Sequence, residues 1–199
     1  MNILSLFSVP VTRQENFLSK EECSEILEYI KDAKTHKHPA LIGKSESTYD
    51  LTSSIFDLFP NCLKSQIVAR LSENLNLFAG AIGYPNQEIA NSWHNIQSEN
   101  SILKMHTHPT SRISGALYLL VDENSSEITF ANPNASLVSY AGFKHETPYS
   151  FISYSFKPHI GDLFMFPSWL EHGSNGVANA TNKRIVISFN SCNQNLGKW

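Results

Sequence analysis

Two histidines separated by one residue stand at the end of an apolar segment, in the order His106, Thr107, His108, Pro109. In an extended chain, residues i and i+2 project to the same face, so both imidazoles can reach one metal ion. Pro109 has no amide hydrogen to give to a β-ladder, so it ends the strand and leaves the pair at a rim. An HxH pair by itself fits an ordinary polar strand face equally well, and a third ligand is needed to favour a metal site.

A third histidine, His172, follows a segment that begins at the Gly161 turn and continues through an aromatic strand. Twelve residues later, Arg184 opens an apolar strand. Turn-forming residues lie between them, so we predict a hairpin that turns near Ala178 and brings Arg184 beside His172. An arginine that leads an apolar strand either faces solvent or meets a carboxylate, and its planar fork suits a small dicarboxylate.

Together these motifs resemble those of the 2-oxoglutarate- and Fe(II)-dependent oxygenases. The similarity covers about residues 92–190 and also includes Ser114-Gly-Ala-Leu-Tyr-Leu, Phe166-Pro-Ser and the strand that starts at Arg184. It is closest to a group found in phage and bacterial genomes that shares the HxH–Pro motif. The resemblance implies a double-stranded β-helix with helices packed on one of its sheets.

The resemblance also implies an iron site. His106 and His172 match the family's two metal-binding histidines. Most members have His-x-Asp or His-x-Glu where this chain has an HxH pair, and the usual non-haem Fe(II) site is two histidines and one carboxylate. The expected ligand set is therefore His106, His108 and His172, with His108 either a ligand or a close neighbour. A third neutral imidazole removes one negative charge from the site, which bears on the metal's identity and on catalytic competence.

Four further residues receive cosubstrate roles from the resemblance. Arg184 matches the basic residue that binds the distal carboxylate of 2-oxoglutarate, and Tyr118 matches a position that helps to hold it. Trp93 and Asn95 fall on the strand that lines the cosubstrate pocket in family members. The implied activity is oxidation of a substrate, a small molecule or a protein, by O2 with Fe(II) and 2-oxoglutarate, and with release of succinate and CO2.

A cupin-type metal enzyme is the nearest alternative, because the segment from Gly161 to His172 is similar to the second cupin motif. Cupins usually place a glutamate within a few residues of the HxH pair, whereas the first acidic residue here is Asp122. A cupin also gives no reason for Arg184. A second alternative is a non-catalytic jelly-roll protein that binds a metal or a small molecule. All three share a jelly-roll core, so the expected fold is the same.

The surrounding elements fit a mainly β protein with N-terminal helices. Ser19 and Glu22 form a capping-box pattern that predicts a helix of about four turns, and a second helix is expected over 63–81. Short strands separated by turn residues follow. We expect them at 90–97, 101–106, 113–121, 127–131, 149–156, 162–166, 171–177 and 183–190. We predict a single domain, 1–199, with 1–88 as mainly helical support and 89–199 as a double-stranded β-helix core.

The remaining histidines are expected to be surface or satisfied polar residues. They are His36 and His38 in a polar linker, His94, which could also line the site, His145 in the long loop 132–148, and His159 before the Gly161 turn. Loops of that length are often functional or mobile.

Composition limits the partners. The chain has 199 residues, only 17% of them charged, and a formal net charge of −3, which disfavours nucleic-acid binding. The three cysteines lie far apart, and no stretch has the features of a signal peptide or a membrane span. We therefore expect a cytoplasmic protein without nucleic-acid or membrane partners, for which a homodimer is an open alternative.

Overall fold

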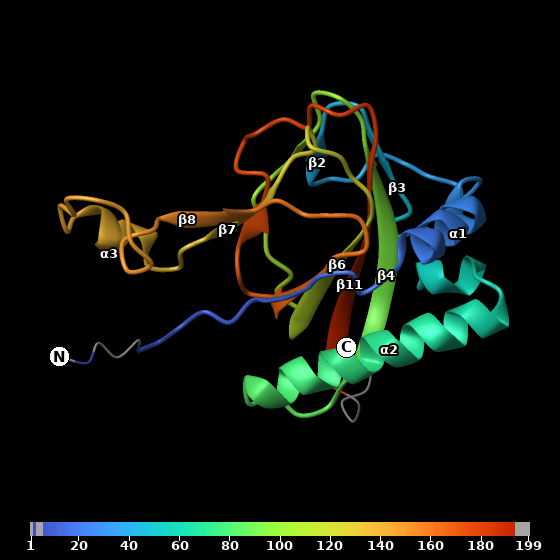
Figure 1. Ribbon diagram of the computed structural model, residues 1–199, viewed down its shortest axis with the longest axis horizontal. Coiled ribbons are helices and arrows are strands. Elements are labelled where there is room, and N and C mark those ends of the chain that lie inside the picture. Colours follow the sequence, from blue (N-terminus) through green and yellow to red (C-terminus); the bar gives the residue numbers. More distant parts are fainter. Residues whose placement is uncertain (1, 3–5, 194–199) are drawn as a thin grey trace.

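The computed structural model describes residue 2 and residues 6–193 and arranges the main strands in two antiparallel sheets (Figure 1). The larger sheet has the order β1-β9-β6-β11-β4-β3 and the smaller one the order β10-β7-β8. The larger sheet contains β1 (Thr12–Gln14), β9 (Leu163–Pro167), β6 (Ile113–Leu120), β11 (Arg184–Asn193), β4 (Gln87–Gln97) and β3 (Ser45–Ser47). The smaller contains β10 (His172–Gly173), β7 (Ile128–Ala131) and β8 (Ser153–Phe156). This is the double-stranded β-helix core expected from the sequence.

Both faces of the larger sheet are covered, which explains its nearly continuous apolar strands. Along β11, Ile185, Ile187 and Phe189 pack on the helical side. Arg184 and Val186, which alternate with them, lie on the side of the smaller sheet. Because side chains alternate along a strand, β11 contributes residues both to the core under the helices and to the space between the two sheets.

Helices α1 (Lys20–Ile30) and α2 (Asn61–Ala81) pack against the outer face of this sheet (Figure 1). The predicted capping box is present, since Ser19 Oγ accepts from the Glu22 amide and Glu22 Oε2 accepts from the Ser19 amide. The first helix ends at Ile30 and is shorter than expected, while the second matches its prediction. A 3-10 helix, Ile55–Leu58, lies between them. None of the described helices has the length and apolar character needed to span a bilayer.

The hairpin predicted between His172 and Arg184 is wrong. Strand β10 pairs with β7, whereas β11 pairs with β4 and β6 in the other sheet. The segment between β10 and β11 crosses from the smaller sheet to the larger one, and hydrogen bonds of Asn179 hold it in this position. The Asn179 side chain donates to Ser98 O at 3.2 Å and accepts from the Ser126 amide at 3.1 Å. A local turn pattern could not predict these long-range bonds.

The strands expected at 101–106, 149–156 and 171–177 are shorter in the structure, and two other regions also differ from the sequence expectation. The polar stretch after the first helix contains β2 (Leu41–Ile42), which pairs with β5 (Ile102–Leu103), in addition to β3. The predicted long loop 132–148 contains a short helix, α3 (Ala135–Ser139). Together with the ends of β7 and β8, α3 forms an arm that projects from the body of the molecule (Figure 1).

Candidate active site

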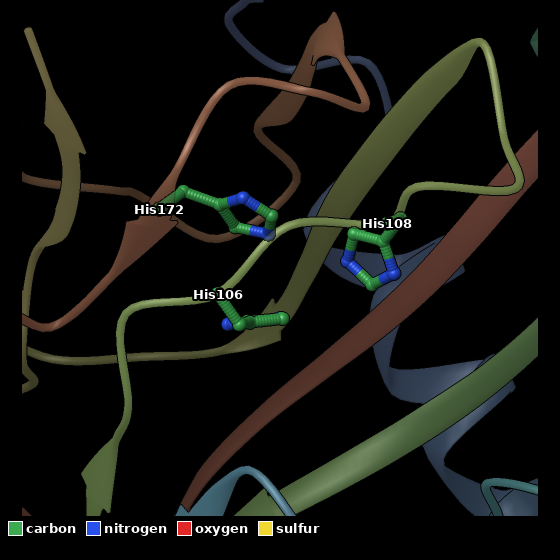
Figure 2. Close-up of side chains that lie close together, drawn as sticks. All are labelled: His106, His108 and His172. Carbon is green, nitrogen blue, oxygen red and sulfur yellow. The ribbon is translucent and has the colours of Figure 1, made fainter. Parts of the chain in front are cut away.

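Three imidazoles converge between the sheets (Figure 2). His106 and His172 are paired through their backbones, with the amide of each donating to the carbonyl of the other at 2.9 and 3.0 Å. His108 lies two residues further along the extended segment, as predicted. One ring nitrogen from each histidine lies within 4.8 Å of the others. Among the described residues this is the one cluster of potential metal-ligating side chains.

Backbone carbonyls orient two of the three rings. His106 Nδ1 donates to Lys104 O at 2.8 Å, and His172 Nδ1 donates to Leu170 O at 2.9 Å. A carbonyl oxygen can only accept, so in both rings the proton is on Nδ1 and the lone pair is on Nε2. Tethers of this kind fix the tautomer and the orientation of metal-binding histidines.

Burial keeps the cluster uncharged. It lowers the pKa of His172 to about 3 and the pKa of His108 to about 4, and the neighbouring His106 adds to both effects. Burial also lowers the pKa of His106. At neutral pH all three rings are therefore neutral, which is the form that binds a metal.

Gly173 is the residue that lets the chain pass so close to this cluster. A Cβ at Gly173 would lie 2.7 Å from Lys104 O and 2.9 Å from Leu103 O. Because Lys104 O is also the carbonyl that orients His106, a side chain here would displace that tether. The requirement for a glycine after His172 is therefore steric, and the sequence alone does not reveal it.

The other end of the pocket contains a buried cation. Arg184 is only 4% exposed and lies with its guanidinium carbon 5.0 Å from the centre of the Tyr118 ring. It donates to Gln97 Oε1 and, at 3.3 Å, to the Tyr118 hydroxyl. Burial lowers the pKa of Arg184 and raises that of Tyr118. No described carboxylate is bonded to this guanidinium, so its charge has no counter-charge in the described chain.

Several buried polar atoms along this pocket have no hydrogen-bond partner among the described residues. Buried polar groups in folded proteins are nearly always satisfied, so a group of orphans in one pocket indicates a place for a polar ligand. Those lining the pocket are Trp93 Nε1, Asn95 Oδ1, Gln97 Nε2, Ser126 Oγ and Arg184 Nε.

The structure brings all the site residues named from the sequence into one pocket. They are Trp93, Asn95, His106, His108, Tyr118, His172 and Arg184. Sequence reasoning missed Gln97, although it lies two residues beyond Asn95 on the same strand face and that spacing was the available signal.

Sequence reasoning also set His38 aside as a polar linker residue. In the structure His38 is buried at 7% exposure and lines the pocket beside Trp93. No local pattern marks it, because it reaches the pocket through the pairing of β2 with β5.

Solved structures share this fold. HygX from Streptomyces hygroscopicus, with nickel and 2-oxoglutarate bound, matches with a TM-score of 0.64 and 11% identity, over 96% of this chain and 85% of that one. A prolyl-4-hydroxylase from Pseudomonas putida matches with a TM-score of 0.62 and 12% identity over 94% of each chain. The collagen prolyl hydroxylase of Paramecium Bursaria Chlorella virus-1 matches with a TM-score of 0.57 and 12% identity, over 91% of this chain and 94% of that one. No curated protein matches this chain.

A family model described as "Putative 2OG-Fe(II) oxygenase" matches residues 91–190. This match favours the oxygenase over the cupin and the non-catalytic jelly roll. The matched span covers half of the chain and contains every pocket residue that the motifs named. The chain therefore belongs to the 2OG-Fe(II) oxygenase family.

Proposed function

We propose that this chain oxidises its substrate with Fe(II) at one end of the pocket and with 2-oxoglutarate, whose distal carboxylate is held at the other end. The observation that carries the proposal is the pairing of a neutral three-histidine cluster with a buried, uncompensated Arg184 in the same cavity. A metal suits the first group and a dicarboxylate suits the second.

The histidine cluster fits the iron of this family in most respects. His106, His108 and His172 would hold it, because imidazole is a good ligand for iron and two of the rings are already oriented through Nδ1. The donor set differs from the usual one in having no carboxylate. Three neutral ligands leave the full charge of the metal for anionic groups that bind beside them.

The opposite end fits the distal carboxylate of 2-oxoglutarate. Arg184 supplies the charge, while Gln97 Oε1 and the Tyr118 hydroxyl hold two of its nitrogens in place. The unpartnered donors Arg184 Nε and Gln97 Nε2 would complete the bonding to an anion. Trp93 and Asn95, on the same strand face as Gln97, line the path between the two ends.

The iron, when bound, supplies oxygen activation coupled to oxidative decarboxylation of 2-oxoglutarate to succinate and CO2. The protein's part is orientation and exclusion of water. The Phe166 ring lies 4.5 Å from the His172 ring, centre to centre, and the Phe130 ring lies 6.3 Å away, so the deep side of the histidine cluster is apolar. We place the protein in the cytoplasm, without nucleic-acid or membrane partners, on its cysteine pattern and its net charge of −3.

Anaerobic absorption spectroscopy tests the proposal. We expect a weak visible charge-transfer band only when Fe(II) and 2-oxoglutarate are both present, and its loss in His172→Ala. Succinate formed in air without a substrate should disappear in Arg184→Ala. His145→Ala, which removes an exposed histidine of the arm, is the matched control and should retain both signals. A wild-type protein without the band, or a His172→Ala variant that keeps it, would overturn the proposal.

A further inference from the structure

A wall of the pocket comes from the segment that contains β2. Leu41 and Ile42 pair with β5, and the Lys104 amide donates to Ala40 O at 2.9 Å. These bonds hold the segment against the chain that leads to the histidine cluster. His38, four residues before the end of β2, lines the pocket.

The His38 ring is held in one orientation. The Ala40 amide donates to His38 Nδ1 at 3.0 Å. The ring packs edge-on against Tyr49 at 4.6 Å between centres and stacks near Trp93 at 6.5 Å with an interplanar angle of 15°. Since an amide N–H can only donate, Nδ1 is the acceptor and the ring proton is on Nε2. Among the described residues, none accepts a hydrogen bond from His38 Nε2.

His38 is also uncharged. Burial lowers its pKa to about 4, and the neighbouring His106 and His36 add to the effect. A neutral N–H between aromatic rings suits a neutral oxygen acceptor. A carboxylate or phosphate between these rings would lose its hydration without meeting a positive charge such as that of Arg184 at the other end, and a neutral carbonyl loses much less.

We propose that His38 determines substrate specificity by donating from Nε2 to a neutral carbonyl oxygen, as in an amide, of the substrate. The inference rests on the proposed function, which fills the remainder of the pocket with iron and 2-oxoglutarate. It names the substrate class as amide-containing or related neutral carbonyl compounds, and it assigns the 36–42 segment to substrate binding.

Nuclear magnetic resonance of the protein loaded with Zn(II) and 2-oxoglutarate tests this, because zinc gives a stable, diamagnetic complex without turnover. With 15N-labelled histidine, we expect His38 to be the Nε2–H tautomer. Titration with N-methylacetamide should shift its Nε2 signal saturably, while acetate, of similar size but charged, should shift it much less. The exposed His36, in the same segment, is the internal reference. An Nδ1–H tautomer, an amide response no larger than that of His36, or a preference for acetate overturns the inference.

Two variants separate the hydrogen bond from the shape of the wall. His38→Gln keeps an N–H donor, and His38→Phe keeps the ring without one. Reading the Trp93 indole signal, we expect N-methylacetamide affinity within about threefold of wild type in the glutamine variant and at least about tenfold weaker in the phenylalanine variant. Equal affinities in both variants would contradict the proposal. Zn(II) and 2-oxoglutarate should bind equally in all three proteins, and if they do not bind to wild type, it is the proposed function that fails.

Discussion

The two ends of the pocket are both buried and polar, but they are built in opposite ways. At the histidine end, backbone carbonyls orient two of the three rings, and burial makes all of them neutral. At the arginine end, only neutral side chains contact the guanidinium, and its charge is left without a counter-charge among the described residues.

This difference determines how much folding free energy each end of the pocket costs when no ligand is bound. A neutral imidazole that makes its hydrogen bond is stable in an apolar setting without a metal. A buried charge without a partner costs several kcal/mol until an anion arrives. The histidine end is therefore organised by the fold itself, while the arginine end depends on its ligand.

The largest effect is expected from removing a ligand at the histidine end. His172→Ala takes away one of three donors, and loss of an outer-shell partner alone typically costs about 10–100-fold in metal affinity. We expect Ni(II) affinity, measured by calorimetry, to fall by more than about 100-fold. His145→Ala should leave it unchanged. A His172→Ala protein that binds Ni(II) nearly as well as wild type would remove His172 from the ligand set.

A change at the arginine end should act on the cosubstrate and not on the metal. Arg184→Met should weaken 2-oxoglutarate binding by about 100-fold, because truncating one partner of a buried charge pair costs about 2–5 kcal/mol. The ligand-free variant should be at least as stable as wild type, since the unpaired charge is gone. Calorimetry and chemical denaturation measure the two quantities. Arg184→Lys keeps the charge but loses the planar fork, so its affinity for 2-oxoglutarate should lie between that of wild type and that of Arg184→Met.

A marked loss of stability in Arg184→Met would contradict the comparison, because it would show that the arginine is satisfied without a ligand. Unchanged 2-oxoglutarate affinity would move the carboxylate site elsewhere.

Acid should distinguish the two ends through folding stability. The histidine pKa values in the folded chain lie below the usual 6.5, so the unfolded chain takes up protons first as the pH falls from about 6.5 towards 4. The stabilisation is fully present above about pH 6.5 and is lost through this window, at up to about 1.4 kcal/mol per pH unit for each histidine. Denaturation of the metal-free protein at a series of pH values measures it.

In this pH series, the free energy of unfolding of His108→Gln should fall less steeply with decreasing pH than that of wild type. Arg184→Met should run parallel to wild type, because the guanidinium stays protonated across the window in both states. Equal slopes for His108→Gln and wild type would mean that His108 is not buried as a neutral ring.

The parts of the site that the residues alone predicted are those encoded by short-range geometry, whereas the roles of Tyr118, Trp93 and Asn95 came from the family resemblance. The HxH pair shares a face because of strand alternation, and Arg184 is conspicuous because it leads an apolar strand. His38 and the crossing fixed by Asn179 depend on contacts between residues far apart in the chain. The very short strand β2 likewise exists through tertiary pairing and not through its own composition, so local patterns carry no information on it. Strand β10 lies within the strand predicted at 171–177, but only two of those residues pair with β7.

The smallest effect concerns the side chain that positions the arginine. Gln97 accepts from Arg184 without adding charge, so it orients the guanidinium and leaves its charge for the ligand. Gln97→Leu should weaken 2-oxoglutarate binding by about fivefold, in keeping with about 1 kcal/mol for one hydrogen bond, and should leave Ni(II) affinity unchanged. Gln97→Glu is the informative partner variant, because its carboxylate would pair with Arg184 inside the protein. It should stabilise the ligand-free fold and compete with 2-oxoglutarate. If Gln97→Glu instead bound 2-oxoglutarate as tightly as wild type, the uncompensated charge would not be what draws the cosubstrate to this end.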